Sequence, residues 1–157
     1  YKSDTTTKIF DNSFLLQEKD KTVFDRKKLK FVTKIKPTKS EIKDMEFAFK
    51  ICKYVKSNAI VYARDAQTIG VGAGQMSRVI SAKIAGLKAA EEGLSVPGAV
   101  MASDAFFPFV DGVESLVQAG VSAIIQPSGS IRDKEIIKFA NRTGTVLVFS
   151  KTRHFKH

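Results

Sequence analysis

The sequence has few of the residues that build disulfide frameworks and transition-metal sites. It contains a single cysteine, Cys52, and two histidines, His154 and His157, which both lie in the last four residues. One cysteine cannot form an internal disulfide, so we expect a reduced, cytoplasmic setting. A deaminase-type zinc site needs a Pro-Cys-x-x-Cys motif besides its first ligand and a glutamate, so composition excludes zinc bound by cysteines and histidines.

Long hydrophobic runs, internal repeats and Gly/Ser-rich linkers are also absent. No apolar run approaches the 18 or so residues of a membrane span, so we expect no membrane contact. The first residues, Tyr1 to Asp4, are polar and do not resemble a signal peptide. The 157 residues include 43% hydrophobic side chains, which suits one folded domain that buries about 70% of its chain surface.

Positive charge is concentrated in the first third of the chain. The formal net charge is +10, of which residues 1–56 carry +7 and residues 57–157 carry +3. This balance favours anionic partners, either nucleic acid or phosphorylated small molecules, although a solvated lysine-rich surface explains it at least as simply. A basic nucleic-acid-binding module without enzymatic activity would need lysines interleaved with aromatic residues. Residues 27–36 offer only Phe31, so we expect no nucleic-acid partner.

Hydrophobic periodicity and turn residues predict an α/β fold. We expect residues 1–11 to be irregular, strands at 13–18, 29–34, 59–63, 68–73, 98–103, 121–126 and 145–150, and helices at 38–56, 74–92, 111–119 and 132–143. Strands alternate with helices from residue 59 on, which predicts a largely parallel, covered sheet. Residues 1–37 are interpreted as an N-terminal extension and residues 38–157 as the main unit.

Two of these helices carry specific expectations. Thr38 and Glu41 have capping-box spacing, which predicts where the helix at 38–56 begins. In the helix at 74–92, Arg78 should point about 180° away from the apolar face, as a solvated arginine. The side chains expected to face inward are the larger apolar ones, Met76, Val79, Ile80, Ile84 and Leu87.

Several loops could bind a ligand. The glycines at 70–74 could bring backbone close to an anion or could only permit close packing. Residues 104–111 place three phenylalanines and a proline between Asp104 and Asp111, beyond the carboxyl end of a strand. Asp111, with Glu114 at capping-box spacing, could equally be a helix N-cap. Residues 126–130 could bind an anion or cap the next helix, and the tail at 153–157 could be a frayed end.

Five of these segments together resemble a known family. They are KSNAIVYA (56–63), GVGAGQMSR (70–78), MASDAFFPF (101–109), QPSGSIRD (126–133) and RHFKH (153–157). In this order they look like the C-terminal part of the bifunctional purine-biosynthesis family AICAR transformylase/IMP cyclohydrolase. The resemblance covers about residues 29–157 and implies a cytidine-deaminase-like, three-layer α/β/α subdomain without zinc. Residues 1–37 would then be the end of a preceding transformylase subdomain.

The resemblance implies formyl transfer from 10-formyltetrahydrofolate to the 5-amino group of AICAR, which yields FAICAR. Asn58 matches the family's catalytic asparagine, which lies near the AICAR amine. Arg78 and Phe106 match residues of the AICAR pocket, and Arg153 matches an arginine that holds the AICAR phosphate. The family works as a homodimer, with the site at the interface between the subunits.

Other positions match the folate side of the family's site. Pro108, Phe109 and Asp111 resemble residues that bind folate, and His157 matches a terminal histidine that supports the site. Asp104 resembles part of a structural potassium site, and the family holds no tightly bound organic cofactor.

Three departures from the family pattern bear on activity. The family's catalytic Lys-His pair lies upstream, but the only Lys-His dipeptide here is Lys156-His157, in a different segment. The IMP cyclohydrolase domain is missing from these 157 residues, and Val110 stands where the family commonly has a basic residue. We therefore expect residues 1–157 alone to be inactive in both reactions.

Overall fold

The computed structural model describes residues 4–157 and contains a hairpin, a six-stranded sheet and four α-helices. The elements are β1 (Thr5–Phe10), β2 (Ser13–Glu18), a 3-10 turn (Arg26–Lys28), β3 (Lys30–Phe31), α1 (Lys39–Cys52), β4 (Ile60–Arg64), β5 (Gln67–Gly72), α2 (Arg78–Glu91), β6 (Val100–Ser103), α3 (Val110–Gln118), β7 (Ala123–Pro127), α4 (Asp133–Thr143) and β8 (Val146–Ser150). All predicted strands and helices are present; the strand at 13–18 has the predicted ends, and the other elements have shifted ones. The expectation of irregular structure at residues 1–11 is wrong from residue 5 on, because β1 pairs with β2.

The sheet is mixed rather than largely parallel. Its order is β3-β8-β7-β6-β4-β5, and only β6, β7 and β8 are mutually parallel. β4 and β5 are antiparallel because only Asp65 and Ala66 join them, and both residues have positive φ angles of 54° and 56°. The buried Asp44 of α1 stabilises this turn, since its carboxylate accepts hydrogen bonds from both turn N–H groups.

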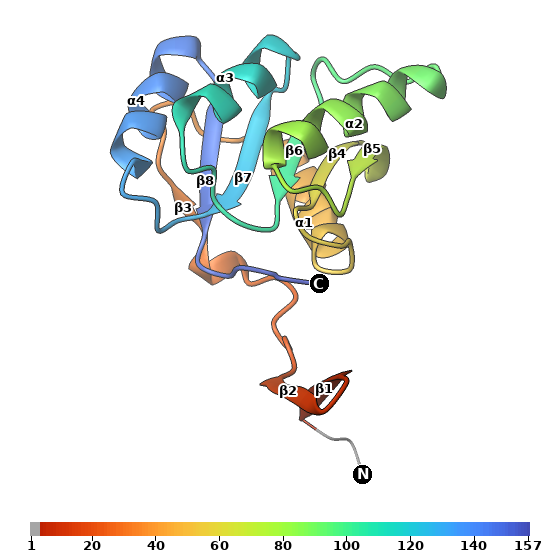
Figure 1. Cartoon of the computed structure of the whole chain (residues 1–157). Helices are drawn as coiled ribbons and strands as arrows, with labels where there is room; N and C mark the ends of the chain where they lie inside the picture. The colour runs from red at the N-terminus through yellow and green to blue at the C-terminus, as the bar shows by residue number, and fades with distance from the viewer. Residues whose placement is uncertain (1–3) are drawn as a thin grey trace.

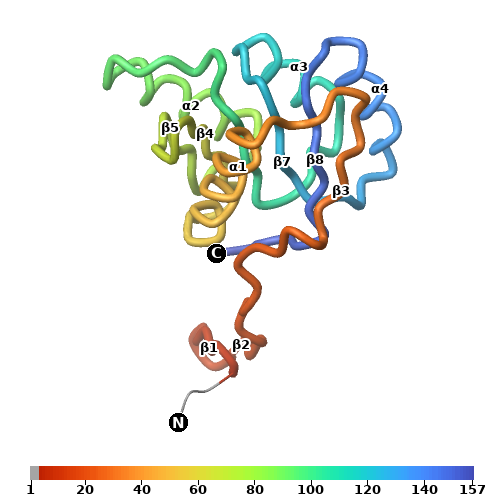
Figure 2. The backbone as a smooth tube through the Cα atoms, turned by 180° about the vertical axis from the view of Figure 1, so that it is seen from behind, coloured from red at the N-terminus to blue at the C-terminus, as the bar shows by residue number. Residues whose placement is uncertain are grey.

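Helices cover both faces of the sheet. Figure 1 shows α2, α3 and α4 on the near face, and Figure 2 shows α1 on the opposite face. Each face has its own apolar core, one centred on Met101, Ile124 and Leu147 and the other on Phe49 and Ile125. The structure thus shows a mixed α/β fold, while the relation to cytidine deaminases stays a prediction.

The prediction of which side chains of α2 face the core is wrong. The helix begins at Arg78 rather than Gly74 and buries its small residues Ser81, Ala82, Ala85 and Ala89. Among the large apolar residues expected inside, Met76 is 100% exposed and Leu87 is 64% exposed. The reason lies in β5, where a Cβ added at Gly72 would lie 1.8 Å from the carbonyl oxygen of Ser81. α2 therefore approaches the sheet too closely for large side chains to fit between them.

The hairpin β1–β2 projects from the rest of the protein (Figures 1 and 2). Its large apolar side chains are exposed, which is uncommon for a two-stranded unit. Downstream of it, β3 joins the main sheet by pairing with β8. The boundary at residue 37 stays a prediction. Within residues 4–157, no helix is long and apolar enough to cross a membrane.

Candidate functional site

A cavity of about 290 Å³ lies where three chain segments meet. The segments are the loop before β4, the start of α2 and the loop between β6 and α3. The predicted site residues among its lining are Asn58, Arg78, Pro108, Phe109 and Asp111. Ser77, Phe107 and Gly112 also contribute, so the cavity has both polar and aromatic walls.

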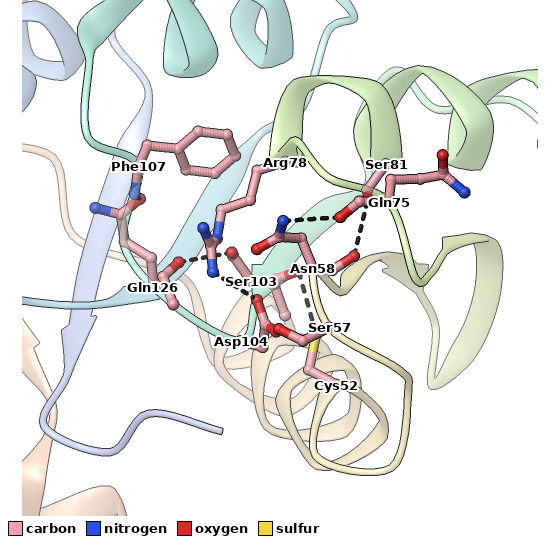
Figure 3. Close-up of polar contacts among 12 residues, drawn as sticks. Cys52, Ser57, Asn58, Gln75, Arg78, Ser81, Ser103, Asp104, Phe107 and Gln126 are labelled. Atoms are coloured by element: carbon pink, nitrogen blue, oxygen red, sulfur yellow. Dashed lines mark hydrogen bonds and ion pairs between the residues drawn. The ribbon is translucent and has the colours of Figure 1, made fainter. Parts of the chain in front are cut away.

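Asn58 is held in place by three hydrogen bonds. Its backbone and side-chain nitrogens donate to the carbonyl oxygen of Gln75, the side-chain contact measuring 2.8 Å. Ser81 of α2 donates its hydroxyl to the Asn58 carbonyl at 2.7 Å. The carboxamide oxygen of Asn58 then faces the side of Arg78 (Figure 3). This oxygen can accept a hydrogen bond from a ligand while the rest of the residue stays fixed.

Arg78 is not the solvated side chain that its helix position predicted. Its side chain is only 15% exposed, and its Nη2 lies 3.3 Å from the Oδ1 of Asp104, which is 1% exposed. Ser57 donates its hydroxyl to the other oxygen of Asp104 (Figure 3). The Nε of Arg78 is buried and has no partner within residues 4–157. The guanidinium is thus anchored by Asp104, and Arg78 contributes to the lining of the cavity.

The phenylalanine side chains of the loop between β6 and α3 differ in their surroundings. Phe107 is buried, and its ring packs so close to Gly112 that an added Cβ would lie 2.4 Å away. Phe109 is 53% exposed, and the guanidinium of Arg132 lies 5.1 Å from the centre of its ring. The predicted N-cap role of Asp111 is wrong. The residue before α3 is Phe109, and Asp111 instead accepts a hydrogen bond from the N–H of Gly112.

Besides Asp104, which pairs with Arg78, three predicted site residues do not line this cavity. Phe106 lies beside Gly129, where its ring would be 3.8 Å from an added Cβ. Arg153 stacks on Phe155, with its guanidinium 5.5 Å from the ring centre. His157 lines a separate cavity of about 400 Å³ near β1 and β2, and its carbonyl oxygen accepts a hydrogen bond from Lys8.

The family can be identified independently of this geometry. The family model described as "AICARFT/IMPCHase bienzyme" matches residues 1–88, more than half of the chain, and the matched stretch contains Asn58 and Arg78. The protein belongs to this bienzyme family. Membership supports a role in purine biosynthesis and confirms the resemblance found in the sequence.

Two of the anion-binding hypotheses are not favoured by the structure of this AICARFT/IMPCHase family member. Gly70 and Gly72 serve close packing, since added Cβ atoms would collide with the backbone of α2. In the loop after β7, the N–H groups of Gly129 and Ser130 both donate to the carboxylate of Asp133. These two backbone donors are already occupied by an internal anion.

Burial keeps Cys52 out of acid–base chemistry in this family member. Loss of solvent, and secondarily the nearby Asp104 carboxylate, raises the pKa of the Cys52 thiol well above its ordinary value. The protonated thiol donates to the carbonyl oxygen of Ala102 at 3.3 Å. Within residues 4–157, no group of three or more His, Cys, Asp or Glu side chains is arranged to hold a metal ion.

Sequence reasoning missed several residues that shape the site. Ser57, Gln75 and Ser81 position Asn58 and Asp104 through hydrogen bonds, and His154 is buried in the tail. Ser57 could have been found because it precedes Asn58 in the same matching segment. No local signal indicates Gln75 or Ser81, because their bonds join different elements of the fold.

Proposed function

We propose that this protein forms part of an AICAR transformylase site, which transfers a formyl group from 10-formyltetrahydrofolate to the 5-amino group of AICAR. One observation carries the proposal. Asn58, Arg78, Pro108, Phe109 and Asp111, assigned by resemblance and drawn from three segments of the chain, line one cavity.

The chemistry suits the polar end of the cavity. The AICAR amine is conjugated to its ring, so it is a weak nucleophile that needs orientation and proton removal. The carboxamide oxygen of Asn58 accepts a hydrogen bond from this amine and orients it, while Gln75 and Ser81 hold the asparagine still. Asn58 has no useful basicity, so it positions the amine and does not take its proton.

The remaining residues divide between the two substrates. Arg78 lines the cavity and donates to AICAR through the part of its guanidinium that Asp104 does not engage, since Asp104 already holds its Nη2. Phe106 and Arg153 complete the AICAR side, with Arg153 on the phosphate. Pro108 and Phe109 offer an apolar surface to the flat folate ring, and Asp111 accepts hydrogen bonds from its nitrogens.

A structural potassium ion near Asp104 belongs to the same proposal. The Asp104 carboxylate and the Ser57 hydroxyl are adjacent, buried oxygen donors, the ligand type that hard cations take. They supply only part of the ligand shell of such an ion, which would neutralise the carboxylate together with Arg78 and fix the loop before Asn58. Thermal unfolding in potassium chloride against tetramethylammonium chloride tests this. We expect a higher midpoint with potassium.

Formyl transfer also needs parts that residues 1–157 do not contain. The general base is assigned to the family's upstream Lys-His pair, and general base catalysis contributes roughly 10²–10⁴-fold. The family site also lies between two subunits, so a homodimer of the complete enzyme is part of the proposal. We expect the chain alone to show neither formyl transfer nor IMP cyclohydrolase activity.

Binding and turnover measurements test the proposal separately. In the 157-residue chain, Asn58→Ala and Arg78→Ala should each weaken AICAR binding by roughly 1–3 kcal/mol, as measured by calorimetry. Arg142→Ala, a change of a surface arginine on α4, is the matched control and should leave binding unchanged. Turnover is followed as tetrahydrofolate formation after adding a separately expressed upstream half. There, Asn58→Ala should lower kcat more than it raises KM. Equal AICAR binding by all four proteins would contradict the proposed site.

A further inference from the structure

His154 anchors the C-terminal tail. It is the only buried residue among 151–157, with 1% of its surface exposed, whereas Arg153 and Phe155 on either side are exposed. The sequence offered a frayed end as the simplest interpretation of this segment. A buried polar ring in the middle of it indicates a specific docking position instead.

The imidazole of His154 is held by residues far away in the sequence. Its Nδ1 lies 2.5 Å from the Oδ2 of Asp20, 134 positions earlier in the chain, and its ring packs on Phe49 of α1 at a centroid distance of 5.0 Å. Asp20 is itself fixed, since Lys53 donates to its backbone carbonyl at 2.6 Å. The ring therefore occupies a slot built by the N-terminal segment and α1.

Backbone hydrogen bonds connect the anchored tail to the candidate site. The N–H of His154 donates to the carbonyl oxygen of Asp104 at 3.0 Å, and the N–H of Ser57 donates to that of Lys156 at 2.8 Å. Asp104 pairs with Arg78, and Ser57 directly precedes Asn58. These two bonds fix where the tail lies relative to the candidate site.

We propose that His154 is a positioning residue that places Arg153 for binding the substrate phosphate; this inference rests on the proposed function of Arg153. Burial of His154 turns Arg153 to the solvent side, where its guanidinium lies over Phe155. Arg153 has no carboxylate partner within residues 4–157, so its charge is available to an anion.

The physical reason is conformational entropy. A short terminal segment without a docked side chain samples many conformations, and a ligand that needs Arg153 would then have to order the segment on binding. Docking His154 supplies that order beforehand. The effect should be confined to ligands that carry a phosphate, because a ligand without one does not use Arg153.

The experiment compares AICAR with its riboside, which lacks the phosphate, as ligands of the 157-residue chain. His154→Leu removes the ring nitrogens, and Asp20→Ala removes the partner of Nδ1 at a position whose side chain is 42% exposed. Both should weaken AICAR binding on the order of tenfold and riboside binding less than twofold. The double variant should be no weaker than the worse single variant, because the two residues act as one unit.

Two further variants separate positioning from stability. His154→Asn keeps a donor at the place of Nδ1 and should restore most AICAR affinity while losing the stability that the ring on Phe49 contributes. Lys151→Ala changes an exposed residue of the same tail and should bind AICAR like the unaltered chain. A structural role alone would instead weaken both ligands together and leave His154→Asn unrescued.

The outcomes distinguish this inference from the proposed function. If Arg153→Ala weakens AICAR but His154→Leu and Asp20→Ala do not, the positioning role is overturned and the proposed function stands. If the unaltered chain binds AICAR no better than the riboside, the phosphate role of Arg153 is wrong. The positioning role then falls with it, and hydrogen exchange at the Ser57 amide tests the anchoring of the tail alone. At least tenfold faster exchange in His154→Leu would support the tail anchor, and unchanged exchange would overturn it.

Discussion

Replacing Gly72 with alanine tests the close approach of α2 to the sheet, on which the site depends. The added Cβ would lie 1.8 Å from the carbonyl oxygen of Ser81, whereas real Cβ atoms essentially never come within 3.0 Å, so α2 must retreat by about 1.2 Å. The obstacle is helix backbone, which cannot rotate away as a side chain can. Overpacking of this kind costs roughly 1–3 kcal/mol, and we expect the upper end of that range.

The same displacement reaches the candidate site. Ser81 donates its hydroxyl to the Asn58 carbonyl at 2.7 Å, and a retreat of α2 breaks that bond, at a further cost of about 1 kcal/mol. Gly72→Ala should therefore lower the free energy of unfolding by about 4 kcal/mol in total. Urea denaturation measures this loss. AICAR affinity should fall with it, since Asn58 and Arg78 both change position relative to the cavity.

Gly86→Ala is the matched control on the same helix. A Cβ at Gly86 would meet nothing within 4 Å, and alanine is a better helix former than glycine. We expect this variant to be about 0.5–1 kcal/mol more stable than the unaltered chain and to bind AICAR normally. A Gly72→Ala protein within about 0.5 kcal/mol of the unaltered chain, on the scale of an ordinary surface change, would refute the packing argument.

Three further predictions address single interactions. Thr38→Ala removes the N-cap of α1 and should cost about 1 kcal/mol in thermal unfolding; an unchanged midpoint would contradict the capping role. A hydrogen bond from Lys50 lowers the pKa of Glu46 below its ordinary 4.5, so the stability it contributes is present above pH 4.5 and lost as the pH falls through the lowered value. Glu46→Gln should therefore cost less than about 1 kcal/mol in urea denaturation at neutral pH and nothing in acid. Since burial, and then Asp104, raises the pKa of the Cys52 thiol, iodoacetamide should label Cys52 in the unfolded chain but not in the native one, as measured by mass spectrometry.

The sequence by itself determined the features that depend on neighbouring residues. Thr38 and Glu41 form the predicted capping box, in which each side chain accepts a hydrogen bond from the backbone N–H of the other. Gly144 directly follows α4 and adopts the left-handed conformation, at φ 72°, that glycine favours at a helix end. Such signals act over three or four residues, so no tertiary information is needed to recognise them. The resemblance to the family can likewise be recognised from the sequence alone, because each of the five matching segments is continuous.

Only the tertiary structure decided which surfaces meet. The periodicity of α2 marks its large apolar residues, but the buried face is the small one, because Gly72 of a different element sets the distance between helix and sheet. Arg78 is drawn to Asp104 and His154 to Asp20 across 26 and 134 positions of the chain. These pairings become strong only after the surrounding core has formed, because burial lowers the local dielectric around the paired groups. No pattern along the sequence encodes them, because the energy of each contact depends on burial that many distant residues create together.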